Sequence, residues 1–558
     1  MLRYLLLTLS ILIIHLCQAQ NLPAFPGAEG FGSKTIGGRG GKIIEVTNLN
    51  ESGAGSLKEA LLTQRSRTVI FRTGGTISLT KDLFIDEPYI TIAGQTAPGD
   101  GICIRGAAIR IRTHDVIIRN LRFRVGDSLV GPDPDNRDGL TIENSAAETD
   151  PSKEPFNIII DHCSVSWAVD ENMSLWYPCH DITIQNCIIS EGLHKSLHSV
   201  KPGENPGHST GLIIGWHNKQ ISVHHNLFAH NNGRNPNVTF DTETELINNV
   251  IYNWGDWEGT ILSNFENVNF PTKSNIIGNY YKPLQYPTYP ITLSQNLKTN
   301  NKIYIKNNSS PVLAKMYPNL YSSDDWWLVD SNNTNFRSYM PAFTPSGISE
   351  DDTSMVLDKV LNNAGAIIPH LDTVDRRAIF STKNGTGKII DNTNQVGGWP
   401  QFKTGNALSD LDHDGMPDHW EDLHGLNKNL YADANNFDLS PEGYTNIEVY
   451  INGLFDTSAT TKVLDQSPIR ADFTFTNPNH AEAHFNFNLP NNSEVGLFIY
   501  NLQGILIKTL VNSSLQAGQY QYSWNNTNQD GELLPGNIYL VLFKNESNWV
   551  CKKLVMLR

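Results

Sequence analysis

Short runs of β-branched residues recur between about residues 66 and 282, and this repetition restricts the possible folds more than any other feature of the chain. Most runs mix apolar with polar positions, as half-buried strands do. Many runs end in an amide or imidazole side chain, and the spacing between these ends is often a little over twenty residues. These end residues are Asn120, His162, Asn186, Asn226, Asn249 and Asn279.

A repeat of this length matches one coil of a right-handed, single-stranded parallel β-helix. Stacked asparagine side chains satisfy the backbone groups of the turns inside such a solenoid. A β-sandwich is the alternative, but sandwiches show turn signals at closer and more even spacing. We therefore predict an all-β chain with a parallel β-helix over residues 21–400. The helical spacing of apolar residues in 351–364 predicts a helix that packs against one end or side of it.

The N-terminus of this 558-residue chain predicts export. Residues 1–20 combine a basic start, an apolar centre and a small-residue end, as secretory signal peptides do. The apolar run is too short to span a bilayer comfortably, and no later segment predicts a transmembrane helix. The formal net charge of −15 argues against nucleic acid as a partner. An acidic ligand would need a local concentration of cations.

Chemically useful side chains gather in four segments of the predicted solenoid. Successive coils of a β-helix lie about 4.8 Å apart, so residues distant in sequence can line one groove. The segments are Asp133–Ile142, Asp161–Ser174, Gly192–His198 and His224–Pro236.

These segments, together with Ala24–Gly32, resemble polysaccharide lyase family 1, the pectate lyase superfamily. The resemblance covers roughly residues 22–400. The Asp161-His162 strand, the His224-His225-Asn226 strand and the turn from Arg234 to Pro236 carry it together. It implies an enzyme that cleaves polygalacturonate, an acidic plant-type polysaccharide, by Ca²⁺-assisted β-elimination.

The resemblance also assigns roles to individual residues. Asp138 and Asp170 match two ligands of the active-site calcium ion. Ser174 stands where the family has a third ligand, and the neighbouring Glu171 can compensate for that change. Lys195 lies near the substrate-binding lysine of the family. The substrate-binding residues implied by the resemblance are Lys195 and His198, and the catalytic arginine is Arg234.

Elementary chemistry agrees with these residue types. Loss of the C5 proton of a uronate builds negative charge on its carboxylate, and Ca²⁺ is a hard cation that prefers oxygen ligands. Arg234 has two candidate roles, proton acceptor or clamp for the substrate carboxylate, because a guanidinium normally keeps its proton. Two alternatives for the whole chain stay open: a lyase for pectin or another polyuronate, and a non-catalytic β-helix that binds polysaccharide.

A second calcium signal follows the predicted solenoid, within residues 405–455. Acidic residues occupy positions 1, 3, 5, 9 and 12 of a loop with glycine at position 6, which is the ligand order of an EF-hand loop. The predicted structural calcium ligands are Asp410, Asp412, Asp414, Asp418 and Glu421. The loop resembles dockerin and thrombospondin type 3 calcium loops, and a degenerate second half is expected between residues 433 and 448. A solvated acidic linker is the alternative.

Alternating strands return at the C-terminus, over residues 466–558, and predict a small β-sandwich. This region resembles the C-terminal sorting domain of type IX secretion. The matching pieces are Tyr500–Gly504, Ala517–Tyr520, Gly531–Tyr539 and Lys552–Arg558. The resemblance implies the type IX secretion machinery as a partner, and secretion to the outside or outer surface of a Gram-negative bacterium. A carbohydrate-binding module is the alternative.

Overall fold

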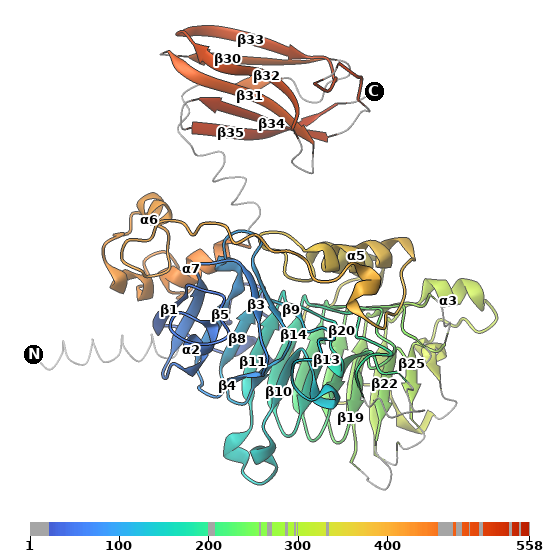
Figure 1. Ribbon diagram of the computed structural model, residues 1–558. Helices are drawn as coiled ribbons and strands as arrows, with labels where there is room; N and C mark the ends of the chain where they lie inside the picture. The colour runs from blue at the N-terminus through green and yellow to red at the C-terminus, as the bar shows by residue number, and fades with distance from the viewer. Residues whose placement is uncertain are drawn as a thin grey trace, which may run out of the picture. The chain divides into compact units, whose positions relative to one another are not determined.

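The computed structural model shows two compact units, residues 1–452 and residues 453–558 (Figure 1). The structure describes residues 22–556 apart from short gaps, so the predicted signal peptide lies outside the described residues. The gaps are 199–206, 256–257, 265–269, 285–287, 295–296, 298–299, 331–333, 456–472, 476–481, 490–491, 502–505, 530, 535–537 and 546–547.

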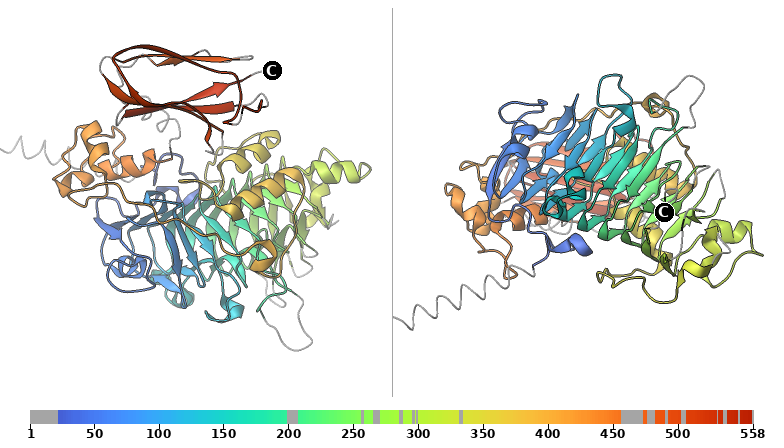
Figure 2. Two further views of the ribbon diagram at one scale, coloured as in Figure 1. Left: turned by 45° about the horizontal axis from the view of Figure 1, so that its top comes forward. Right: turned by 90° about the horizontal axis from the view of Figure 1, so that it is seen from below.

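The first unit is a parallel β-helix, as the sequence predicts. Three parallel sheets run along it, and each coil contributes one strand to each sheet in turn (Figure 2). Sheet A has the order β1 (Lys42–Val46), β2 (Arg67–Phe71), β5 (Ile90–Ala93), β8 (Val116–Arg119), β11 (Phe156–Asp161), β14 (His180–Gln185), β17 (Lys219–His224), β20 (Glu243–Ile247), β23 (Lys273–Ile277), β26 (Lys302–Lys306) and β28 (Arg337–Ser338). Sheet B has β3 (Gly75–Ser78), β6 (Ile102–Arg105), β9 (Arg122–Arg124), β12 (Ser164–Ser166), β15 (Ile188–Ser190), β18 (Leu227–Ala229), β21 (Val250–Tyr252) and β24 (Tyr280–Lys282). Sheet C has β4 (Leu83–Ile85), β7 (Ile109–Ile111), β10 (Leu140–Glu143), β13 (Glu171–Trp176), β16 (Thr210–Ile214), β19 (Asn237–Thr239), β22 (Thr260–Ser263), β25 (Ile291–Leu293) and β27 (Val329–Asp330).

Isoleucine, leucine and valine side chains from all three sheets fill the interior of the solenoid. Burial of this continuous apolar core is the main stabilising contribution, because no single coil can bury its apolar face alone. An asparagine ladder adds to it: the amide of Asn226 bonds to Asn249 at 3.0 Å, and that of Asn249 to Asn279 at 3.0 Å. The ladder continues to Asn308 at 2.9 Å.

The predicted ladder is one residue out of register in the earlier coils. Asn120, His162 and Asn186 do not belong to the ladder but occupy the preceding turn position, with φ between 49° and 57°. Asparagine, and to a lesser extent histidine, tolerates this left-handed conformation. Cys187 stands at the ladder position of its coil, where its N–H donates to the side chain of Asn226 at 2.8 Å.

Helices cover parts of the solenoid (Figure 1). The predicted helix is α4, which packs through Val356 and Val360 on apolar side chains of sheet B and therefore on the side of the solenoid. Met416 and Ile447 bring the region of α6 and α7 onto Ile43 of sheet A. The helices are α2 (Leu57–Leu62), α3 (Pro311–Met316), α4 (Thr353–Asn363), α5 (Thr373–Asn384), α6 (Asp418–His424) and α7 (Asn446–Gly453).

The second unit contains two antiparallel sheets around their own apolar core, which is the predicted β-sandwich. One sheet has the order β29 (Thr474–Phe475), β30 (Ala483–Leu489) and β33 (Gly518–Trp524). The other has β32 (Leu506–Leu515), β31 (Ser493–Asn501), β34 (Ile538–Asn545) and β35 (Asn548–Val555). Within the described ranges of both units, no helix has the length and apolar character needed to cross a membrane.

Candidate active site and calcium loop

The turns that connect a sheet B strand to the following sheet C strand, here called B–C turns, carry the predicted active-site residues. Asp138 precedes β10, Asp170 precedes β13 and Arg234 precedes β19. Because β10, β13, β16 and β19 are consecutive in sheet C, these turns stack side by side. The solenoid therefore brings residues almost one hundred positions apart in sequence to one wall.

Three carboxylates on this wall form a tight acidic group. Oxygens of Asp138, Asp170 and Glu171 all lie within 4.8 Å of one another. Asp138 accepts hydrogen bonds from the N–H of Glu171 at 3.1 Å and from the hydroxyl of Thr141 at 3.0 Å. Burial, and then the nearby charge of Asp170, raises the pKa of Asp138 to about 8.

Arg234 reaches this acidic group from two coils away. Its guanidinium contacts the carboxylate of Glu171, although Thr210 of β16 lies between them, paired with Glu171 on one side and with Gly233 on the other. Burial lowers the pKa of Arg234, while the charges of Asp170 and Asp138 oppose that effect.

Two histidines lie against Asp170. The distances from its Oδ1 are 3.4 Å to Nε2 of His198 and 3.5 Å to Nδ1 of His208. The two rings stack with centroids 4.1 Å apart and planes inclined by 4°. Parallel rings direct their nitrogen lone pairs along separate planes, so this pair is not arranged to hold one transition-metal ion. Hydrogen bonding to Asp170 raises the pKa of His198, and burial lowers that of His208 to about 4.

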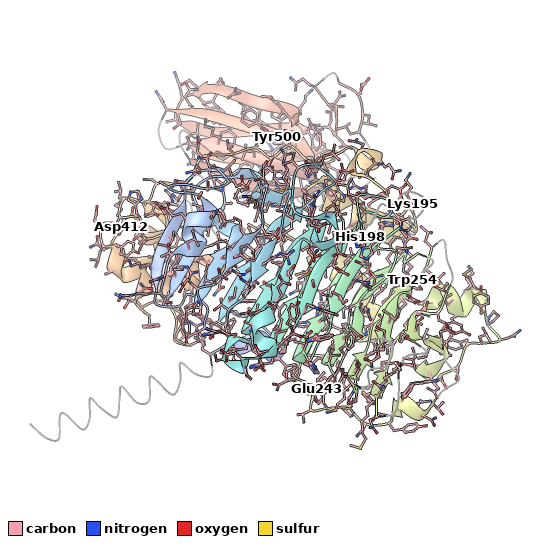
Figure 3. All side chains as sticks on the ribbon, turned by 60° about the horizontal axis from the view of Figure 1, so that its bottom comes forward. Lys195, His198, Glu243, Trp254, Asp412 and Tyr500 are labelled. Carbon is pink, nitrogen blue, oxygen red and sulfur yellow. The ribbon has the colours of Figure 1, made fainter. Side chains whose placement is uncertain are left out.

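The other predicted residues lie at different distances from the acidic group. Ser174 is buried on β13 beside Thr141 of β10, whose hydroxyl binds Asp138. Lys195 is exposed, and its backbone N–H donates to Asp391 at 3.1 Å; among the described residues, its side chain forms no ion pair. Figure 3 shows Lys195 close to His198 and well separated from Asp412.

The predictions omitted His208 and Thr210. Both stand immediately before or at the start of β16, in the same place relative to sheet C as the aspartates. The position of each residue relative to the next sheet C strand is the signal that locates them.

The acidic group fits a divalent cation. Its carboxylates are the oxygen ligands that Ca²⁺ prefers, and burial together with the charge of Asp170 raises the pKa of Asp138. An ion there would be held by Asp138, Asp170 and Glu171, and it would relieve their mutual repulsion.

The loop that follows the solenoid holds a second acidic group. Oxygens of Asp412, Asp414, Glu421 and Asp433 lie within 4.8 Å of one another. Several of these oxygens are buried without a hydrogen-bond partner, and an unpaired buried carboxylate is costly. They are both oxygens of Asp412 and Glu421, Oδ2 of Asp414 and Oδ1 of Asp433.

Like charges in the second group raise the carboxyl pKa values as well. Burial, followed by the charges of Asp412 and Glu421, raises the pKa of Asp414 to about 8. Burial and the charges of Asp412 and Asp433 raise that of Glu421 to about 7. Converging buried oxygens without donors fit a bound Ca²⁺ better than a solvated linker.

Two of the predicted loop ligands have other partners in the structure. Asp410 accepts the backbone N–H of Asp414 and of Gly415, at 3.3 Å and 3.1 Å, and pairs with Arg72 at 3.4 Å. Asp418 accepts the N–H of Leu411 at 2.8 Å and the hydroxyl of Ser409. Asp433, from the expected second half, supplies the fourth carboxylate of the group instead.

Comparison with known proteins gives a consistent set of relatives. The chain is 33% identical over 461 residues to "Probable pectate lyase C" of Aspergillus flavus, which covers 80% of this chain and 97% of that protein. It is 33% identical over 455 residues to the protein of the same name from Emericella nidulans, covering 79% and 95%. "Pectate lyase 2" of Ambrosia artemisiifolia is 26% identical over 243 residues, which is 41% of this chain and 57% of that protein.

The solved structures to which the chain is similar include jun a 1, the major allergen from cedar pollen. It has a TM-score of 0.41 and 18% identity, and the match covers 61% of this chain and 92% of that chain. A pectate lyase variant from Xanthomonas campestris has a TM-score of 0.39 and 17% identity, covering 62% and 100%. No family model matches the chain.

Proposed function

The chain belongs to the pectate lyase family, and on that basis we propose that it cleaves α-1,4-linked polygalacturonate by Ca²⁺-assisted β-elimination. The observation that carries this proposal is the meeting of three carboxylates and Arg234 on one wall of the solenoid. A cation site beside a basic side chain is what removal of a proton next to a carboxylate requires. The products would be 4,5-unsaturated oligouronides.

Arg234 is the proposed proton acceptor. In β-elimination the C5 proton leaves, a double bond forms between C4 and C5, and the glycosidic oxygen departs from C4 and takes a proton from water. Burial favours the neutral guanidine form that can accept the C5 proton. The charges of Asp170 and Asp138 oppose that form, so they have to be balanced before Arg234 releases its own proton.

The remaining residues hold and position the reactants. Asp138, Asp170 and Glu171 would hold Ca²⁺, with Ser174 beside them on β13. When bound, the ion supplies positive charge that stabilises the substrate carboxylate as negative charge develops on it. His198 and Lys195, at the edge of the same wall, would bind neighbouring uronate groups.

An absorbance assay tests this function. The unsaturated product absorbs in the near ultraviolet, so the absorbance of a polygalacturonate solution should rise when protein and Ca²⁺ are present and stay constant with chelator. A parallel assay on methyl-esterified pectin separates the two lyase alternatives. Polymer binding without any absorbance rise, unchanged in Arg234→Ala, would instead establish a non-catalytic binder.

The second acidic group has a structural role in this proposal. It would hold one Ca²⁺ through Asp412, Asp414, Glu421 and Asp433, and so fix the loop against the first coils of the solenoid. Met416, Ala434 and Ile447, which lie in and beside the loop, pack on sheet A. The ion would stabilise that contact.

We further propose that the C-terminal sandwich directs export through the type IX machinery, to the outside or outer surface of a Gram-negative bacterium. Its two-sheet architecture and its sequence motifs support this role. Removing residues 466–558 should leave the protein inside the cells of a type IX host, as seen by fractionation. Unchanged export of the truncated chain would contradict the proposal.

A further inference from the structure

A cavity of about 490 Å³ lies on the B–C turns of the coils that precede the acidic group. Its lining includes Arg105, the last residue of β6, and Trp399, from the segment after α5. The Gly- and Asn-rich composition of residues 390–399 is typical of a linker, but the structure places this segment along the B–C turns. We call residues 390–399 the strap.

The strap connects the cavity with the wall that carries Asp138, Asp170 and Arg234, here called the catalytic wall after its proposed role. At one end, the carbonyl of Ile390 accepts the N–H of His194 at 2.8 Å, and Asp391 accepts that of Lys195 at 3.1 Å. At the other end, the indole N–H of Trp399 donates to the carbonyl of Arg124 at 3.0 Å. One continuous segment therefore borders the groove from Lys195 to the cavity.

Trp399 is held firmly in place. Its ring meets that of the buried Trp167 edge-on, with centroids 5.9 Å apart. Gly126 passes so close to the indole that a Cβ there would lie 2.0 Å from the ring, so the close packing requires glycine. A fixed, half-buried indole at the edge of a cavity is a suitable platform for a sugar ring.

Arg105 supplies an unneutralised positive charge over the ring of Trp399. Its guanidinium lies 5.5 Å from the centre of the Trp399 ring, and its Nε donates to the hydroxyl of Ser78 at 2.9 Å. Over the described parts of the chain, no carboxylate lies within ion-pair distance of Arg105. Two arginines of the following sheet C strand and turn differ: Arg110 pairs with Asp82 and Glu143, and Arg112 pairs with Asp86.

Asp127 also lines the cavity, and its Oδ1 accepts the hydroxyl of Thr393 at 3.1 Å. That bond ties the carboxylate to the strap. In a chain with a net charge of −15, a guanidinium left without a carboxylate in a groove is an available partner for an acidic ligand.

We propose that Arg105 and Trp399 form a distal subsite that binds one uronate residue of the same polysaccharide chain. Arg105 binds the carboxylate, and the exposed part of the Trp399 ring packs against the sugar. The coil of Arg105 is four strand steps from that of Arg234, through β7, β10, β13, β16 and β19. At about 4.8 Å a step, this separation is roughly 19 Å. The subsite therefore engages only substrates long enough to extend beyond the catalytic wall. This inference rests on the proposed lyase function.

The test measures kinetics against substrate length. Arg105→Gln should raise KM for polygalacturonate about tenfold, because a charge-assisted hydrogen bond is lost, and leave kcat within about twofold. For digalacturonate or trigalacturonate, KM should match that of the parent. Arg105→Lys should recover part of the loss. Arg112→Gln, which removes an arginine that is already paired, is the matched control and should leave KM unchanged.

Binding measurements separate this proposal from the function itself. In the Arg234→Ala background, calorimetry with intact polygalacturonate should show weaker binding when Arg105→Gln is added. Loss of turnover in the parent would defeat the lyase proposal without affecting this readout. An equal change in KM for long and short substrates, or unchanged polymer binding in the double variant, would overturn the distal subsite.

Discussion

The two acidic groups of the solenoid unit look alike in composition but differ in their surroundings. In the group of Asp138, Asp170 and Glu171, here called the catalytic group after its proposed role, Glu171 contacts Arg234 and Asp170 lies against His198. In the loop group, the unpaired oxygens have no cationic partner among the described residues, since Arg72 reaches only Asp410 and Glu45. The first group is partly neutralised by groups of the groove, and the second is not.

We propose that this difference gives a bound Ca²⁺ ion a different task at each group. A site that already has cationic neighbours gains less free energy from binding Ca²⁺. Its ion would therefore exchange between the site, the substrate and the solution. A buried site without such neighbours gains more, because binding removes the cost of unpaired carboxylates. We therefore expect tight structural binding in the loop and weaker, activity-linked binding at the catalytic wall.

The largest effect should come from removing Arg234, the side chain whose positive charge distinguishes the catalytic group. Arg234→Ala should lower kcat on polygalacturonate about 10²–10⁴-fold, since it removes the proposed proton acceptor. Arg234→Lys is the matched variant and should recover little activity if proton transfer needs the guanidine. The melting temperature in Ca²⁺ should stay near that of the parent. Near-normal turnover in Arg234→Ala would contradict the assignment of this groove as the active site.

Changing one carboxylate in each group should separate activity from stability. Asp170→Ala should raise the Ca²⁺ concentration for half-maximal activity at least about tenfold, without changing the Ca²⁺ dependence of the melting temperature. Activity titrated with buffered Ca²⁺ measures the first quantity, and thermal unfolding in the same buffers measures the second. A parallel shift of both curves would mean that the two sites are not independent.

Asp433→Asn should change the Ca²⁺ dependence of the melting temperature and leave that of activity unchanged. It keeps the shape that accepts the N–H of Asn427 but removes a charge from the loop group. At a fixed Ca²⁺ concentration above saturation, each tenfold loss of affinity should lower the free energy of unfolding by about 1.4 kcal/mol. Asp418→Asn is the matched control, since Asp418 binds Ser409 and Leu411 instead. Equal destabilisation by both variants would contradict the assigned ligand set.

The pH dependence tests the burial and crowding of the loop carboxylates. The folded-state pKa values of Asp414 and Glu421, about 8 and about 7, lie above the values near 4 expected in the unfolded chain. The Ca²⁺-free folded protein therefore binds more protons, and its stability should fall as the pH rises from about 5 to 8. Saturating Ca²⁺ should remove that decrease. Thermal unfolding with chelator that shows no decrease over this range would argue against the crowding of the loop carboxylates.

The repeat of β-branched runs was enough to predict the solenoid, because coil after coil shows the same pattern, often a little over twenty residues apart. The exact register was harder, since asparagine can serve in the ladder or in the left-handed turn beside it. Asn186 and Asn226 illustrate the two uses.

The candidate sites were also predictable only in part. Asp138, Asp170 and Arg234 could be located by motif, whereas His208 could not, because a long insertion separates it from the preceding strand of its coil. Asp433 joins the loop group because the fold brings it back to residues 412–421, and no local spacing in the sequence predicts that contact. The strap was similarly hidden, since its Gly- and Asn-rich composition is also that of a linker.

One titration tests the central claim most directly. Turnover of polygalacturonate and the melting temperature should be followed together as free Ca²⁺ is raised from chelated levels. We expect the melting temperature to reach its plateau first, and turnover to begin and saturate at higher Ca²⁺. Full turnover in chelator, or a single shared midpoint for both curves, would contradict two calcium sites with separate tasks.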